Sequence, residues 1–150
     1  MKTFITLMKF ITLIAVMLIN TAYGQMVSQP YWKVKENLIK NHYSAIDEDN
    51  TDDGNLYLSA MSKYGDLWIF YFNRDNICYG VTLSPKDWAS DQVFMDGFND
   101  SDRDPDFKVK KLEYNKWLIN DWLVCKRVYI DGVKWGTGYS YQYWDIKNEK

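Results

Sequence analysis

The apolar residues of this chain recur at every second position in short runs separated by turns, and this pattern restricts the fold more than any other feature. Residues 55–62 alternate in this way. After short polar turns, residues 67–72 form a continuous apolar and aromatic run, and residues 77–83 follow with Tyr79 and Val81 in register. Strands joined by such short turns pair as antiparallel neighbours. The first half of the chain is therefore expected to contain three antiparallel strands.

Two segments have helical rather than alternating spacing. After Pro30, the apolar residues Tyr31, Val34 and Leu38 recur every three to four positions, which predicts an amphipathic helix of about three turns. The tetrapeptide at residues 84–87, Ser-Pro-Lys-Asp, has the form of a capping box with proline at the first helical position. It predicts a second helix that ends near Phe98 and buries Trp88, Met95 and Phe98.

The second half of the chain returns to strand-like alternation. Three or four expected strands cover residues 107–114, 117–119, 122–130 and 133–144, with a turn at Asn120-Asp121 and the clearest hairpin turn at Asp131-Gly132. We therefore predict an α+β fold: a single antiparallel sheet of about six strands with two helices, in the order α-βββ-α-βββ. Residues 25–150 are expected to form this single domain.

The first 24 residues have the composition of a cleaved signal peptide. Lys2 and Lys9 are followed by an apolar run over residues 10–19 and by the small residues Ala22 and Gly24. The run is about half the ~20 residues that a membrane-spanning helix needs. We therefore expect an exported protein, periplasmic or extracellular, without a membrane anchor after cleavage. Translation from Met1 or from Met8 would each leave a usable signal.

The charge balance argues against nucleic acid as a partner. The chain has 18 Lys and Arg against 20 Asp and Glu, whereas nucleic-acid-binding domains have a basic excess. Loss of the signal with its two lysines would leave 16 basic residues and a net charge of −4. No glycine-rich loop that could hold a phosphate is present, and we expect no cofactor.

Cys78 and Cys125 are the only cysteines, and both fall in strand-like segments. An exported protein can form a disulfide. Two cysteines set no spacing pattern, however, and buried free thiols behave as small apolar side chains. The sequence leaves both interpretations open.

Four aspartates form the candidate metal site: Asp100, Asp102, Asp104 and Asp106 alternate within one acidic loop. Several carboxylates on one turn could hold a hard cation such as calcium. The loop fails the EF-hand pattern, because Pro105 stands at the glycine position and Lys111 at the bidentate glutamate position. Solvated acidic loops are therefore the favoured interpretation.

Catalytic motifs are missing from the sequence. It has no nucleophile elbow or zinc-protease motif, and His42 is its single histidine. A small secreted hydrolase whose Asp/Glu acid–base pair is assembled only by the fold remains the alternative function.

Aromatic residues are the one positive indication of function. Tyr139, Tyr141 and Tyr143 alternate, so an extended strand would place all three on one face, with Trp135 on the segment before them. Such a face would form part of the core or contact a protein or glycan. We expect a small exported, non-enzymatic binding protein. An inhibitor or immunity-type protein for a cationic partner is one form of this, because acidic loops steer such partners.

Overall fold

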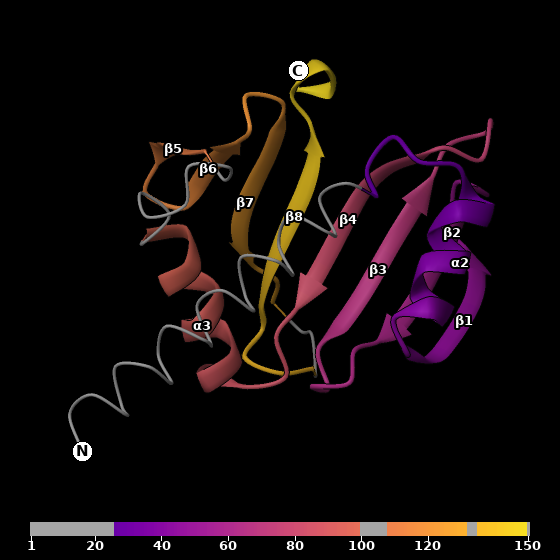
Figure 1. Ribbon diagram of the computed structural model, residues 1–150, viewed down its shortest axis with the longest axis horizontal. Helices are drawn as coiled ribbons and strands as arrows, with labels where there is room; N and C mark the ends of the chain where they lie inside the picture. The colour runs from indigo at the N-terminus through magenta and orange to yellow at the C-terminus, as the bar shows by residue number, and fades with distance from the viewer. Residues whose placement is uncertain (1–25, 100–107, 132–134, 150) are drawn as a thin grey trace.

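The computed structural model describes residues 26–99, 108–131 and 135–149. They form an α+β fold with one antiparallel sheet of eight strands in the order β1-β2-β3-β4-β8-β7-β6-β5 (Figure 1). The strands are β1 Ser44–Asn50, β2 Leu56–Met61, β3 Leu67–Phe72, β4 Cys78–Ser84, β5 Val109–Glu113, β6 Lys116–Ile119, β7 Leu123–Tyr129 and β8 Tyr139–Asp145. The two halves of the chain meet where β4 pairs with β8.

The expected number of six strands is wrong, and β1 shows why. Its sequence, Ser-Ala-Ile-Asp-Glu-Asp-Asn, has no apolar alternation, and the first expected strand began only at residue 55. The backbone nevertheless pairs with β2 from Asp47↔Ser59 to Asn50↔Leu56. An edge strand needs few buried side chains, and charged residues on it prevent pairing with other chains. The observed order is α-ββββ-α-ββββ.

Both helices pack on the same face of the sheet (Figure 1). Helix α2, Tyr31–Lys40, matches the predicted helix and buries Val34 and Leu38. Helix α3, Trp88–Asn99, buries Phe94 and Phe98. The core lies between these helices and the side chains that the strands direct toward them.

Helix α3 begins later than the capping box predicted. Ser84 belongs to β4, and its hydroxyl lies 2.8 Å from the Ser140 hydroxyl on β8. The carboxylate of Asp87 instead accepts a 2.8 Å hydrogen bond from the Ser90 amide, so Asp87 has the capping role. Trp88, expected in the core, is 64% exposed at the start of this helix.

The turns agree in part with the sequence. Asn120 and Asp121, predicted to form a turn, have φ values of 49° and 63°, as a type I′ hairpin requires. The last strand begins at Tyr139, and Trp135 lies in a bend before it. Gly132 of the predicted Asp131-Gly132 hairpin is outside the described residues.

The predicted signal peptide, residues 1–24, also lies outside the described residues. Neither α2 nor α3 has the length and hydropathy to cross a bilayer, and no other helix of the described residues does.

Candidate functional site

The tyrosines of β8 share one face, as the alternation predicted, but this is the face that α3 covers. Tyr141 is 0% exposed and Tyr143 is 2% exposed, whereas Tyr139 is half-buried at the start of the strand. Strand β8 lies in the middle of the sheet, so its inward side chains are enclosed on all sides. The expectation of a solvent-facing row is therefore wrong for Tyr141 and Tyr143, and only Tyr139 reaches the surface.

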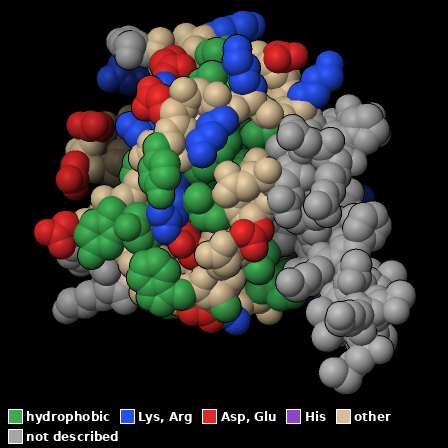
Figure 2. Space-filling model, turned by 90° about the vertical axis from the view of Figure 1, so that its left-hand side faces the viewer, with side chains coloured by type: hydrophobic (Ala, Val, Ile, Leu, Met, Phe, Trp, Pro, Cys, Tyr) green, Lys and Arg blue, Asp and Glu red, His purple; other side chains and the backbone are tan. Residues whose placement is uncertain are grey.

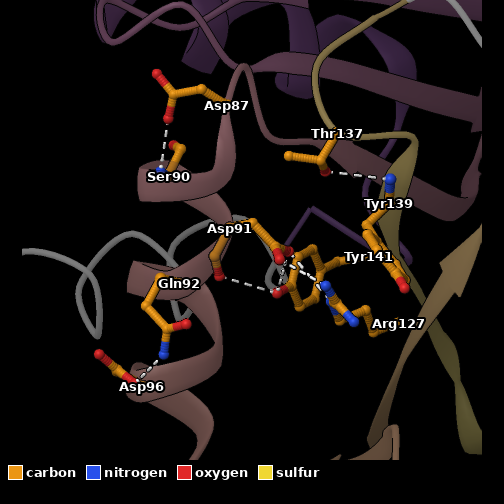
Figure 3. Close-up of polar contacts among 9 residues, drawn as sticks. All are labelled: Asp87, Ser90, Asp91, Gln92, Asp96, Arg127, Thr137, Tyr139 and Tyr141. Atoms are coloured by element: carbon orange, nitrogen blue, oxygen red, sulfur yellow. Dashed lines mark hydrogen bonds and ion pairs between the residues drawn. The ribbon is translucent and has the colours of Figure 1, made fainter.

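A buried ion pair lies at the point where α3 meets the sheet (Figure 3). Asp91 of α3 accepts hydrogen bonds from Arg127 of β7, with Nε–Oδ1 3.1 Å and Nη2–Oδ2 2.5 Å. The Tyr141 hydroxyl donates to the same Oδ1 at 2.8 Å. Burial, then the charge of Asp91, raises the pKa of Tyr141, so the phenol keeps its proton.

Arg127 remains charged in this setting. Burial lowers the pKa of the guanidinium, but the hydrogen bonds and charge of Asp91 outweigh this effect, and the net direction is upward. Both oxygens of the Asp91 carboxylate are engaged by these donors. The contacts of Asp91 therefore fix the positions of the Arg127 and Tyr141 side chains.

Arg127 also supports an aromatic cluster, which we call the Tyr139 patch: Trp88, Arg127, Tyr129 and Tyr139. The guanidinium carbon lies 3.5 Å from the centroid of the Tyr139 ring, a cation–π contact. Trp88 and Tyr129 each contact Tyr139 edge-on, with centroids 5.8 Å and 5.2 Å away. Tyr129 is 62% exposed, close to the value for Trp88, so the patch presents large rings to solvent.

The side of the molecule that carries α3, β5 and β6 faces the viewer in Figure 2. Hydrophobic side chains gather on the lower part of this face, next to Lys and Arg side chains. Exposed apolar side chains that gather on one face in this way are common at interaction sites.

Two glycines shape the turn that leads into the patch. A Cβ on Gly136 would lie 1.9 Å from the carbonyl oxygen of Pro85, so the turn before β8 lies directly against the segment before α3. A Cβ on Gly138, whose φ is +79°, would lie 2.8 Å from the Tyr129 ring. Glycine at these positions lets the turn reach α3 and lets Tyr129 pack over it. Trp135 belongs to this turn and is partly exposed.

The two cysteines are free and buried in the structure, which favours their interpretation as apolar thiols. Cys78 is on β4 and Cys125 on β7, with β8 between them. Strands lie about 4.8 Å apart, so two intervals place the Cα atoms beyond the ~7 Å limit for a disulfide. Burial raises the pKa of Cys78 to about 12 and also raises the pKa of Cys125, which keeps both thiols protonated.

The candidate metal ligands Asp100, Asp102, Asp104 and Asp106 lie outside the described residues. In the part of the chain that the structure describes, no group of three or more His, Cys, Asp or Glu side chains is arranged to hold a metal ion. The calcium hypothesis for the acidic loop is therefore untested.

Comparison with known proteins finds no match for this chain among protein-family models, curated proteins or solved structures.

Sequence reasoning missed most of the Tyr139 patch and the Asp91–Arg127 ion pair that supports it. Asp91, Phe94 and Phe98 share one face of α3 at helical spacing, and Arg127 interrupts an otherwise mainly apolar strand. A charged residue on an apolar helix face, together with one inside a strand, was the available indication of a buried pair. The distance of 36 residues between Asp91 and Arg127 hid their contact.

Proposed function

We propose that this protein is a non-enzymatic binding protein whose contact surface is the Tyr139 patch and whose partner is a protein. The observation that carries the proposal is that Trp88 and Tyr129 are largely exposed while Tyr139 and Arg127 beneath them are held by buried Asp91. A surface fixed in this way loses little conformational entropy on binding.

The chemistry and geometry of the patch favour a protein over a glycan. Trp, Tyr and Arg are the residue types that dominate binding hot spots between proteins. Sugar faces stack on flat ring surfaces, whereas Trp88 and Tyr129 each meet the Tyr139 ring at 63°, so neither ring is coplanar with Tyr139. The rings instead form a ridged surface.

The expected export and the excess of acidic over basic residues agree with a role as a binding protein. An exported domain with net negative charge attracts cationic partners by long-range electrostatics. We propose that the partner is a basic protein and that this chain acts on it as an inhibitor or immunity-type protein.

The alternative of a hydrolase receives less support from the buried carboxylates. Asp66 accepts hydrogen bonds from the Lys86 amide at 3.0 Å and from the Ser90 hydroxyl at 2.7 Å. Asp91 is engaged by Arg127 and Tyr141. Each carboxylate thus ties α3 or the segment before it to the sheet, a structural use that favours the binding proposal.

Site-specific photo-crosslinking tests the proposal. A photoreactive amino acid at Tyr129 is exposed to envelope and secreted proteins of the producing cell. The matched control carries it at Tyr114, an 85% exposed ring on the turn between β5 and β6. We expect one discrete protein to be captured from position 129 and not from position 114.

The captured protein is then purified and titrated against variants. We expect Trp88→Ala with Tyr129→Ala to weaken binding roughly tenfold or more, as loss of hot-spot rings does, and Tyr114→Ala to leave it unchanged. Equal binding by all variants, or binding to a glycan array that depends on Trp88, would overturn the assignment of a protein partner.

A further inference from the structure

A pocket of about 440 Å³ lies between the segment that precedes α2, one side of α2 and the start of β7. Small-molecule sites in proteins have volumes of about 300–1,000 Å³. The residues that line the pocket include Met26, Val27, Gln29, Lys33, Asn37 and Trp122. None of them belongs to the Tyr139 patch, so the pocket is a separate candidate site.

Backbone hydrogen bonds hold the two sides of the pocket in place. On one side, the Ser28 amide donates to the Cys78 carbonyl oxygen at 2.7 Å, and the Cys78 amide donates to the Gln29 carbonyl oxygen at 2.8 Å. On the other side, the Ile146 amide, directly after β8, donates to the Trp122 carbonyl oxygen at 2.8 Å. Because β4 and β8 are neighbours, the pocket lies where the two halves of the chain meet, at the end of the sheet that is uppermost in Figure 1. Ligand pockets often lie where two structural units meet.

The inner wall of the pocket is apolar. Met26 is 3% exposed and Val27 is 2% exposed, and both belong to the hydrophobic core. Trp122 is partly buried and packs against the same core. An aromatic ring or a hydrocarbon chain in the pocket would therefore exchange water for contact with these three side chains.

The remaining lining side chains are polar and have no partners. Lys33 and Asn37 lie one helical turn apart, so they share one side of α2. Among the residues that the structure describes, no hydrogen bond or ion pair engages the Lys33 ammonium or the Asn37 side-chain amide. The side-chain amide of Gln29 is likewise without a partner in the described ranges. The pocket therefore offers several N–H donors to a ligand.

The charge of the lining is positive, although the chain as a whole has a net charge of −2. Lys33 is the one charged side chain among the lining residues, and no carboxylate of the lining neutralises it. Lys35, its neighbour on α2, is instead paired with Glu48. An unpaired ammonium with further N–H donors beside it favours a ligand that has anionic oxygen acceptors.

We propose that this pocket binds a small organic carboxylate that carries an apolar body. The carboxylate accepts from the Lys33 ammonium, with the side-chain amides of Asn37 and Gln29 as further donors. The apolar body lies against the inner wall. Charge-assisted hydrogen bonds are about twice as strong as neutral ones, so Lys33 selects the carboxylate over a neutral ligand of the same shape.

Titration of the isotopically labelled chain, followed by NMR, tests the proposal with phenylbutyrate as the ligand. We expect amide shifts centred on residues 26–29 and Asn37, a shift of the Trp122 indole N–H, and a dissociation constant of about 1 mM or tighter. Phenylbutanol and phenylbutylamine keep the apolar body but lack the carboxylate, whereas butyrate lacks the ring. Each should bind at least about tenfold more weakly, because it leaves either Lys33 or the inner wall without its contact.

Matched variants separate the pocket from the rest of α2. Lys33→Gln should weaken phenylbutyrate binding about tenfold and leave phenylbutanol binding unchanged. Lys40→Gln makes the same change in charge outside the pocket and should bind as the unmodified chain does. Trp122→Leu should weaken the binding of both phenyl ligands, whereas Trp32→Leu, at a 64% exposed ring of α2, should weaken neither. Circular dichroism confirms that each variant is folded.

Three titration results would overturn the proposal: no amide shifts up to about 10 mM phenylbutyrate, shifts centred on another surface, or equal affinities for the carboxylate, the alcohol and the amine. The last result would indicate apolar adsorption in which Lys33 has no part. An equal loss of binding in Lys33→Gln and Lys40→Gln would also overturn it, because general charge attraction would then suffice. W88A/Y129A leaves the pocket intact and should bind phenylbutyrate normally, so this proposal and the binding-protein proposal fail independently.

Discussion

The guanidinium of Arg127 holds the buried carboxylate of Asp91 through two hydrogen bonds and thereby joins α3 to β7. The same guanidinium stacks on Tyr139, which contacts the exposed rings of Trp88 and Tyr129. The exposed patch therefore depends on a buried ion pair.

Replacement of Asp91 by Ala should destabilise the protein strongly. It leaves the charge of Arg127 partly buried without its carboxylate partner and removes the carboxylate acceptor of the Tyr141 hydroxyl. Breaking one partner of a buried pair costs about 3–5 kcal/mol, which chemical denaturation would measure as a lower midpoint.

The double variant Asp91→Leu with Arg127→Met is the matched comparison. Apolar replacement of both partners removes the unpaired charge, so we expect it to recover most of the lost free energy of unfolding. If the double variant is as unstable as Asp91→Ala, an unpaired charge is not the cause. We also expect the recovered variant to lose partner binding, because Tyr139 loses its cation–π contact.

Gly138→Ala should destabilise the chain more than Gly54→Ala. Both glycines have positive φ, +79° and +76°, and each substitution should cost about 1 kcal/mol on that account. Only at Gly138 does the new methyl group meet a ring, that of Tyr129, with a further overpacking cost of about 1–3 kcal/mol. Thermal unfolding of the two variants side by side measures the difference; equal losses would contradict the contact.

The cysteines should react with a thiol reagent only after unfolding. Both are buried, and their raised pKa values keep them protonated in the folded protein. In denaturant without a reductant, we expect two thiols per chain to be titrated. A count of zero would demonstrate a disulfide.

Stability should fall as the pH rises above 9, because burial raises the pKa of Cys78 from 9.0 to about 12 in the folded chain. The unfolded chain then releases this proton at lower pH than the folded one, so the stabilising contribution is complete below pH 9 and decreases above it. At about pH 10 the expected loss is about 1.4 kcal/mol for each such thiol.

Cys78→Ala is the check on that pH dependence. It removes one of the two buried thiols, so the decline in the free energy of unfolding between about pH 8 and pH 10 should become smaller by about the 1.4 kcal/mol expected for one thiol. An unchanged slope would assign the pH dependence to other groups.

Periodicity in the sequence was enough to predict the elements with clear patterns. Helix α2, strands β3 and β4, and the turn at Asn120 were predicted because apolar spacing and turn chemistry are local properties. Strand β1 was missed because its pairing with β2 depends on backbone hydrogen bonds and on few apolar side chains. Its residues alone have the composition of a loop.

The sequence by itself determined that Tyr139, Tyr141 and Tyr143 share one face, because side chains alternate along any strand. Only the tertiary structure decided which face α3 covers, and with it that Tyr141 is enclosed and Tyr139 is not. The same holds for the contact between Asp91 and Arg127. Local patterns carry no information about which distant strands become neighbours, since that depends on how the whole chain buries its apolar surface.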